Sequence, residues 1–238
     1  MKVLVISLQS KPERAARVTA RLDALGVPHD VFSAVDGTRG EHEAWQQYDE
    51  AACLREFGKG LLPAEIGCFA SHYSIWQQCA NEGVPILVLE DDVTILDGFP
   101  DALEIAQAHL EDRQLIRLAG LTRRPFRQVK GLGGRNLVRF LRGPEGTQAY
   151  MLAPEGAEAL LRAATRWIRP VDHFLDRFWV HRVLPYAVLP FEIIHTKDAE
   201  RTSTIGNRWT KRRGWMKVRR ELNKFRDDIS RWVFNFRN

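Results

Sequence analysis

The run Ile86-Leu87-Val88-Leu89 constrains the fold of this chain more than any other segment. Uninterrupted apolar residues are typical of a strand buried on both faces, as in a sheet that helices cover on both sides. The segment from Val3 to Leu8 has the same character. We therefore expect both segments to be interior strands of one α/β sheet.

Helical and extended patterns alternate along the rest of the chain. Pro12 and Pro63 each open a helix with apolar residues at helical spacing, and Gly26 and Gly83 follow the ends of these helices. Further helices are expected at 41–55, 100–111 and 172–181 and after Pro154, and further strands at 29–35, 115–119, 137–142, 148–152 and 184–195. This alternation predicts an α/β sheet flanked by helices.

Two regions stand apart from this alternation. Residues 120–146 are rich in Arg and Gly, and we expect a mobile loop over the site there. The glycine-rich run 131–134 in this region fails the dinucleotide fingerprint, because no clear strand precedes it and no helix follows. A soft boundary near 200–210 divides a domain of residues 1–206 from a tail of residues 207–238.

Composition narrows the class of protein. A hydrophobic content of 45% with 27% charged residues excludes a disordered chain or a coiled coil. No apolar run approaches the roughly 20 residues of a membrane span, and the first one is too short for a signal peptide. The three cysteines show no C-x-x-C pair and no disulfide spacing, which favours a reducing compartment and predicts a cytoplasmic protein.

The triplet Glu90-Asp91-Asp92 follows the best buried strand directly. In open α/β sheets the ligand crevice lies at the carboxyl ends of the strands. Because side chains alternate along a strand, we expect Glu90 and Asp92 to face one way and Asp91 the other. Two carboxylates on one side suit a hard cation that also binds phosphate, Mn²⁺ or Mg²⁺, although a solvated turn is an equally good interpretation.

Several motifs occur in a fixed order around this triplet. The most specific runs from Leu62 to His72 with the pattern E-x-G-C-x-x-S-H, and it stands ahead of Leu89-Glu90-Asp91-Asp92. The others are Glu13-Arg14, Ala34-Val35-Asp36-Gly37, Trp76, Gly146-Thr147-Gln148-Ala149-Tyr150, Pro170-Val171-Asp172 and Ser203-Thr204-Ile205-Gly206. Over most of residues 1–206 the chain thereby resembles the bacterial lipooligosaccharide galactosyltransferases of glycosyltransferase family 25, which are related to the collagen galactosyltransferases.

This resemblance implies a GT-A-like nucleotide-binding fold, a UDP-sugar donor, usually UDP-galactose, and inversion at the transferred carbon. It also implies that Asp92 and Glu90 hold the metal and the donor ribose, and that Ser71 and His72 contact the diphosphate or the donor sugar. A cation that bridges the phosphates would stabilise the charge on the departing diphosphate. The residues expected to bind the donor are Ser7, Leu8, Arg14, Ala34, Asp36, Gly37, Ser71, His72, Glu90 and Asp91.

Several of these assignments have a structural alternative. Arg14 and the Asp36-Gly37 turn suit a nucleotide, but they also fit an ordinary surface helix and turn. His195 ends a late strand and is either the third metal ligand or a hydrogen-bonded strand-end histidine. Cys68 and His72 share a helix face, but zinc needs two more ligands, so we expect Cys68 to be a packing residue.

Inverting transfer needs a base that takes the proton from the acceptor hydroxyl. Asp172 and Asp176 lie one helical turn apart and are the catalytic candidates, with Asp172 preferred. Its position after Pro170-Val171 also suits a helix N-cap, which is the structural alternative.

The tail alone makes the protein basic. Residues 207–238 carry 11 of the 35 Lys and Arg and three of the 30 acids, a local charge of +8 that leaves −3 for the remainder. Apolar residues recur every three or four positions there: Trp215, Val218, Leu222, Phe225, Ile229, Trp232 and Phe236. This pattern predicts a basic amphipathic helix on the inner face of the cell membrane, where a lipid-linked glycan acceptor lies. Docking on the catalytic domain or on a second copy is the alternative, and nucleic acid is not expected as a partner.

Two other functions remain open from the residues. A metal-dependent phosphohydrolase would use the same carboxylates, but it would need neither Ser71-His72 nor the Asp36-Gly37 turn. A non-catalytic module would bind membrane or RNA through the tail.

Overall fold

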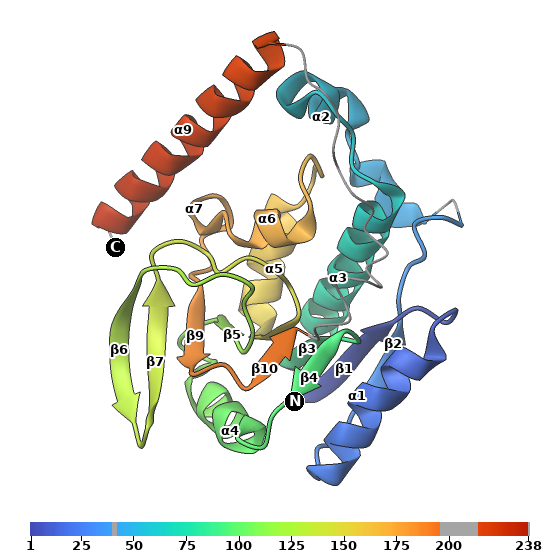
Figure 1. Cartoon of the computed structure of the whole chain (residues 1–238), viewed down its shortest axis with the longest axis vertical. Coiled ribbons are helices and arrows are strands. Elements are labelled where there is room, and N and C mark those ends of the chain that lie inside the picture. The colour runs from blue at the N-terminus through green and yellow to red at the C-terminus, as the bar shows by residue number, and fades with distance from the viewer. Residues whose placement is uncertain (40–41, 196–213, 238) are drawn as a thin grey trace.

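The computed structural model describes residues 1–39, 42–195 and 214–237. Its centre is an eight-stranded sheet with the strand order β2-β1-β3-β8-β5-β9-β7-β6 (Figure 1). Its strands are β1 Lys2–Ser7, β2 Asp30–Ser33, β3 Ile86–Glu90, β5 Leu115–Arg117, β6 Phe126–Leu132, β7 Arg135–Phe140, β8 Ala149–Leu152 and β9 Tyr186–Leu189. A separate antiparallel pair consists of β4 Val93–Ile95 and β10 Ile193–His195.

Helices pack on both faces of the sheet. They are α1 Pro12–Ala24, α2 Glu50–Phe57, α3 Pro63–Glu82, α4 Phe99–His109, α5 Pro154–Ala163, α6 Val171–Leu175, α7 Phe178–His181 and α9 Gly214–Arg237, with the 3-10 helix η1 Glu43–Gln47. Leu87 and Leu89 of β3 contact the core formed with α1 and α4, whereas Val88 contacts the core formed with α3 and α5. The predicted α/β sheet flanked by helices is therefore confirmed, and β3 is buried on both faces as its sequence indicates.

The strand directions place several loops at one edge of the sheet. β1 runs parallel to both β2 and β3, with Ile6 opposite both Phe32 and Glu90. The carboxyl ends of these three strands therefore meet. β8 runs antiparallel to β3 and β5, so the sheet is mixed.

Residues 120–146 do not form the loop that the sequence suggested. β6 and β7 form a hairpin, and Gly133 and Gly134 take φ values of 53° and 89° in its turn. These left-handed values favour glycine, so the glycine-rich run is a hairpin turn that a strand does precede. β6 is an edge strand with almost every residue exposed, which leaves no apolar alternation to reveal it.

Other boundaries also differ from the prediction. The helix expected at 172–181 is two short helices, because α6 ends at Leu175 and α7 begins at Phe178. The strand region 184–195 is divided between β9 and β10, and η1 and α2 replace one helix at 41–55. The domain boundary near residue 206 and the motif at 203–206 lie outside the described residues, so both remain predictions.

The helix α9 docks on the rest of the protein through polar side chains on one face. Asn223 Nδ2 donates to the carbonyl oxygen of Glu56, Asn235 Nδ2 donates to that of Leu141, and Phe234 is buried. Figure 1 shows α9 running beside α2 at one end and toward the β6–β7 hairpin at the other. No helix in the described part of the chain is long and apolar enough to cross a bilayer.

Candidate active site

A cavity of about 340 Å³ opens where β1, β2 and β3 end. All ten residues predicted to bind the donor line it, together with Asp92: Ser7, Leu8, Arg14, Ala34, Asp36, Gly37, Ser71, His72, Glu90 and Asp91. Sequence reasoning did not select Lys11, Thr38 or Cys68, which also line it. Lys11 directly precedes α1, and that position was a usable signal for an anion site. The fold thus brings the predicted set together, while the role of each residue remains a prediction.

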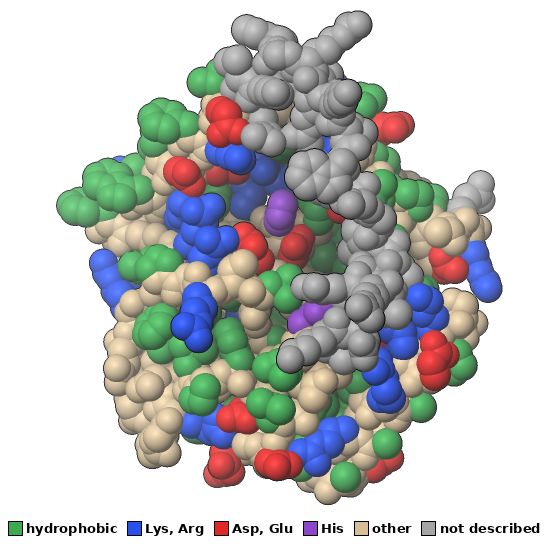
Figure 2. All heavy atoms as spheres, viewed as in Figure 1, with side chains coloured by type: hydrophobic (Ala, Val, Ile, Leu, Met, Phe, Trp, Pro, Cys, Tyr) green, Lys and Arg blue, Asp and Glu red, His purple; other side chains and the backbone are tan. Residues whose placement is uncertain are grey.

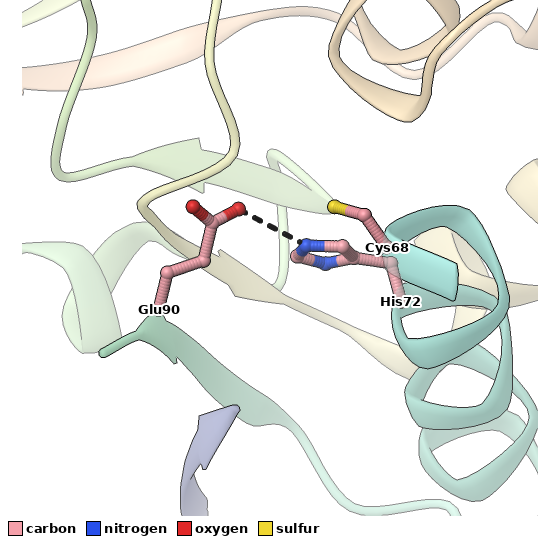
Figure 3. Close-up of side chains that lie close together, drawn as sticks. All are labelled: Cys68, His72 and Glu90. Atoms are coloured by element: carbon pink, nitrogen blue, oxygen red, sulfur yellow. Dashed lines mark hydrogen bonds and ion pairs between the residues drawn. The ribbon is translucent and has the colours of Figure 1, made fainter. Parts of the chain in front are cut away.

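Glu90, the last residue of β3, is held by two neighbouring side chains. His72 Nε2 lies 3.3 Å from Glu90 Oε1, and the Thr147 hydroxyl donates to the same oxygen (Figure 3). Burial raises the pKa of Glu90, but the hydrogen bonds from His72 and Thr147 outweigh burial and leave that pKa below its usual value. Glu90 is therefore an oriented carboxylate, and both of these hydrogen bonds go to Oε1.

A buried chain of hydrogen bonds fixes the ring of His72. Trp76 Nε1 donates to the hydroxyl oxygen of Tyr150 at 2.9 Å, and that oxygen lies 2.8 Å from His72 Nδ1. Since the indole is only a donor, the phenol proton is best used toward Nδ1, which leaves the His72 proton on Nε2 facing Glu90. Burial raises the pKa of Tyr150, so the phenol keeps its proton. The chain Trp76–Tyr150–His72 therefore ends in a donor aimed at Glu90.

Asp91 and Asp92 do not alternate in the way that a continued strand would require. β3 ends at Glu90 and a turn follows, so all three acids line the cavity and the expected opposite orientation of Asp91 is wrong. Ser7 Oγ donates to Asp91 Oδ2 at 2.6 Å. Arg14 lies between the two aspartates, with Nε 3.3 Å from Asp91 Oδ1 and Nη2 3.5 Å from Asp92 Oδ2. The arginine of α1 thus partly balances the charge of the triplet.

Two overlapping groups of side chains are candidates for holding a metal ion. His195 Nε2 lies 3.4 Å from Asp92 Oδ2, because β10 pairs with β4 and places His195 opposite Val93. Burial and then the charge of Glu90 raise the pKa of Asp92 to about 6, although His195 and Arg14 oppose this rise. Carboxylates crowded in this way, with a histidine beside them, suit Mn²⁺ or Mg²⁺.

The second group is Cys68, His72 and Glu90, whose potential ligand atoms all lie within 4.8 Å of one another (Figure 3). If a metal bound His72 Nε2, the ring proton would have to be on Nδ1. The Tyr150 hydroxyl oxygen would then accept from both Trp76 and His72, and its own proton would have no described acceptor. Burial also raises the pKa of the Cys68 thiol well above its usual value, which disfavours the thiolate that binds metals. Glu90, Asp92 and His195 do not form such a close group among the described residues, so their role as the metal ligands remains a prediction.

The Asp36-Gly37 turn and the start of α3 interlock through two glycines. A Cβ on Gly37 would overlap the carbonyl group of Pro63, and a Cβ on Gly67 would lie 2.5 Å from the carbonyl oxygen of Val35. Ser71 Oγ accepts from the Val35 amide and donates to the carbonyl oxygen of Gly67, both at 2.8 Å. Two motifs far apart in sequence thus form the two sides of one backbone contact. Both hydrogen bonds described for the Ser71 hydroxyl lie within this contact.

The two candidate bases differ in their surroundings. Asp176 Oδ1 accepts from Arg117 Nη2 at 3.0 Å and Oδ2 accepts from the Glu145 amide at 2.9 Å, so this carboxylate anchors the 143–147 segment. Asp172 is not the N-cap of α6, because Pro170 holds that position. Only the His173 amide donates to Asp172 in the described contacts. Asp172 does not line the donor cavity, but after burial its charge, with those of Glu90 and Asp92, raises the pKa of Cys68, which does line it.

Known proteins resemble this chain over most of its length. LgtB of Neisseria meningitidis, named as a lacto-N-neotetraose biosynthesis glycosyltransferase, is 34% identical over 204 residues, which cover 82% of this chain and 64% of LgtB. Human "inactive glycosyltransferase 25 family member 3" is 33% identical over 195 residues, 73% of this chain. The chain spans only 31% of the length of that human relative.

Two solved structures resemble the fold of this chain only weakly. A Drosophila beta-1,4-galactosyltransferase 7 variant, in complex with manganese, UDP-Gal and xylobiose, gives a TM-score of 0.43 at 11% identity and covers 90% of this chain and 78% of its own. Both this score and the 0.42 of a Thermus thermophilus mannose-1-phosphate geranyltransferase lie below 0.5, so the assignment comes from the sequence matches. The model described as "Glycosyltransferase family 25 (LPS biosynthesis protein)" matches residues 1–175, and the chain belongs to glycosyltransferase family 25.

Proposed function

We propose that this protein is an inverting glycosyltransferase that moves a hexose, galactose, from a UDP-sugar to a lipooligosaccharide or lipopolysaccharide acceptor. The observation that carries the proposal is the cavity at the ends of β1, β2 and β3, which gathers three acids and two cations around a tight turn: Glu90, Asp91, Asp92, Lys11, Arg14 and the turn at Asp36. The name of the LgtB relative supports the reaction class.

In this proposal Glu90, Asp92 and His195 hold Mn²⁺ or Mg²⁺. The ion, when bound, neutralises charge on the departing diphosphate. Lys11 and Arg14 at the start of α1 bind phosphate oxygens, and Ser7 keeps Asp91 in place behind Arg14. His72 and Thr147 hold Oε1 of Glu90, which leaves Oε2 for the cation or a ribose hydroxyl.

Asp172 acts as the base in this proposal and Asp176 does not. A base must exchange a proton during each turnover, and both oxygens of Asp176 already accept hydrogen bonds from groups that position the 143–147 segment. Asp172 has a freer carboxylate near the same cavity.

UDP release without acceptor tests the donor site. The full chain is incubated with UDP-galactose and a panel of other nucleotide sugars, with Mn²⁺ or with EDTA. We expect slow, metal-dependent UDP release that is most rapid for UDP-galactose and is lost in Asp92→Ala. Asp97→Ala is the matched control, because its side chain is 99% exposed and contacts only Arg21 among the described residues.

The same assay separates the alternatives. Phosphate released from simple esters, with nucleotide sugars left intact, would favour a phosphohydrolase. A folded protein that binds UDP without any turnover would favour a non-catalytic role, which the names of several animal relatives make a real competitor.

We also propose that α9 lies on the cytoplasmic face of the cell membrane, which carries the lipid-linked acceptor. One stripe of α9 carries exposed apolar side chains: Leu222, Phe225, Ile229, Trp232 and Phe236. Phe225, Ile229, Trp232 and Phe236 of this stripe line a surface groove. Arg123, Arg124 and Arg127 line the same groove, and their charge complements anionic lipids. Trp215 and Val218 belong to the predicted stripe, but their side chains lie outside the described set.

Vesicle sedimentation tests this contact. Binding to phosphatidylglycerol vesicles should exceed binding to phosphatidylcholine vesicles, fall with salt, and drop about tenfold or more in Trp232→Ser/Phe236→Ser. Val31→Ser, on the distant edge strand β2, removes an apolar side chain that is 53% exposed and should bind like the wild type. Equal binding by both variants, or a concentration-dependent dimer instead of vesicle binding, would refute the membrane contact.

A further inference from the structure

A second cavity of about 490 Å³ lies beside the donor cavity and has no role in the steps above. Its walls come from segment 57–61, segment 142–145, segment 168–179 and the inner face of α9. Figure 2 shows a hollow next to α9 where cationic, acidic and histidine side chains gather. A concave site of this volume can accommodate a small ligand such as one or two sugar rings.

Six basic and four acidic side chains line this cavity. The basic ones are Lys59, Arg142, Arg169, Arg177, Lys224 and Arg231. Of its four acids, Asp176 pairs with Arg117 and Glu145 with Arg124, and neither arginine lines the cavity. Lys224 pairs with Glu221 and Arg231 pairs with Asp228, which leaves Asp227 to be shared by Arg169 and Arg177.

Asp227 is shared by two guanidinium groups. Its oxygens lie 3.1 Å from Arg169 Nη2 and 3.0 Å from Arg177 Nη2. The buried Nε atoms of both arginines donate to no described acceptor. Burial lowers the pKa of Arg169, and the neighbouring Arg177 lowers it further. An anion beside this pair would relieve their repulsion.

Aromatic rings form the rest of the wall. The guanidinium of Arg169 lies 4.6 Å from the centroid of the Phe57 ring, and Arg177 and Arg231 lie 5.7 Å and 5.8 Å from that of Trp179. Flat rings next to cations offer a sugar an apolar surface and its charged substituent a counter-charge. Inorganic phosphate would use only half of this surface.

A shared wall connects the two cavities. Gly143 and Glu145 line the second cavity, whereas Thr147 donates to Glu90 at the first. Arg117 holds this segment by donating to Gly146 O and to Asp176. A sugar in the second cavity therefore lies across a short stretch of chain from the proposed transfer site.

We propose that the second cavity binds an anionic saccharide, a sugar that carries a phosphate or a carboxylate, as part of the glycosyl acceptor. The acceptor role rests on the function proposed above, whereas the binding itself does not. The helix α9 then has two faces with separate tasks, an inner one that lines this cavity and an outer one that is apolar.

Calorimetric titration of the full chain tests the site. The probes are glucose 6-phosphate, glucuronate, glucose and inorganic phosphate. We expect saturable binding of one or both charged sugars, weaker with added salt, and about tenfold weaker or absent binding of glucose and phosphate. Comparison of the affinities for glucose 6-phosphate and glucuronate shows whether the site prefers a phosphate or a carboxylate.

Two exposed cations on different walls supply the variants. Arg142→Ala and Lys224→Ala should each weaken sugar-phosphate binding about three- to tenfold, because a charge-assisted contact is lost. Arg162→Ala on α5 is the matched control, since that arginine is 69% exposed and, in the described part of the chain, pairs only with Glu158. Circular dichroism verifies that all three fold.

The possible results separate the two proposals. Any one of four results would overturn the saccharide site. These are equal affinity for glucose and glucose 6-phosphate, phosphate binding as tight as sugar-phosphate binding, no binding of any probe, and unchanged affinity in both cavity variants. UDP release by the wild type without acceptor is measured in parallel. Its absence would refute the transferase while leaving the titration result intact.

Discussion

Removing one hydroxyl, that of Tyr150, should both destabilise the protein and loosen its donor site. The phenol oxygen is fully buried and accepts from Trp76 Nε1 at 2.9 Å while facing His72 Nδ1 at 2.8 Å. In Tyr150→Phe the indole donor has no other described acceptor. A buried donor left unsatisfied costs about 1–3 kcal/mol, so we expect a loss of about 2 kcal/mol and a Tm lower by about 4–8 °C.

The functional part of this prediction follows from the tautomer of His72. Without the Tyr150 proton on Nδ1, His72 is no longer held with its Nε2 proton toward Glu90, and Glu90 loses one of its two fixed donors. We expect KM for the nucleotide sugar to rise about three- to tenfold in the UDP-release assay, with a smaller change in kcat. Urea unfolding and steady-state kinetics measure the two effects separately.

Tyr73→Phe is the matched control for this experiment. Tyr73 lies on the same helix as His72 and is half-buried, and its hydroxyl makes no described hydrogen bond. It should change stability by less than about 0.5 kcal/mol. If Tyr150→Phe matched this control in stability, or lost stability without any change in KM, the hydrogen-bond chain would not position Glu90.

Three further variants and conditions test other parts of the structure. Burial lowers the pKa of His181 from 6.5 to about 4, so the neutral imidazole contributes to stability above pH 6.5. About 3 kcal/mol of the free energy of unfolding should be lost as the pH falls from 6.5 to 4. The urea midpoints of the wild type and of His181→Gln should therefore depend differently on pH over that range. Gly67→Ala should cost about 1–3 kcal/mol in urea unfolding and weaken UDP binding. Gly131→Ala should do neither, because its Cβ would meet only two side-chain atoms, at 3.4 Å and 3.9 Å. Asp172→Asn should lower turnover about 100-fold or more at unchanged Tm, whereas Asp176→Asn should lower Tm; the opposite pattern would make Asp176 the base.

The core of the fold was accessible to sequence reasoning because its signals are local. The run 86–89 is apolar throughout, and it is buried on both faces as expected. The prolines that open α1, α3 and α5 mark helix starts with little ambiguity. Strand direction was not accessible, because whether β8 runs parallel or antiparallel to β3 depends on the path of the chain between them.

The site was predictable as a set but not in its geometry. Strand alternation gave Asp91 the wrong direction, because the rule holds only while the strand continues and β3 ends one residue earlier. The hairpin at 126–140 was missed because an edge strand exposed on both faces carries no period-2 pattern. The contact of His72 with Tyr150 joins residues 78 positions apart, a separation at which spacing says nothing.

The orientation of α9 gives the strongest reason to look for a partner outside the chain. An amphipathic helix in a globular protein normally buries its apolar face. Here the polar face docks through Asn223 and Asp227, while Trp232 and Phe236 are 67% and 81% exposed on the other side. Burying that stripe inside the protein would remove Asp227 from Arg169 and Arg177 and dismantle the second cavity. The second cavity is therefore intact only while the apolar face of α9 stays uncovered by the rest of the protein, so another partner must cover that face. A membrane that carries the acceptor would cover it and would present the acceptor to the cavity.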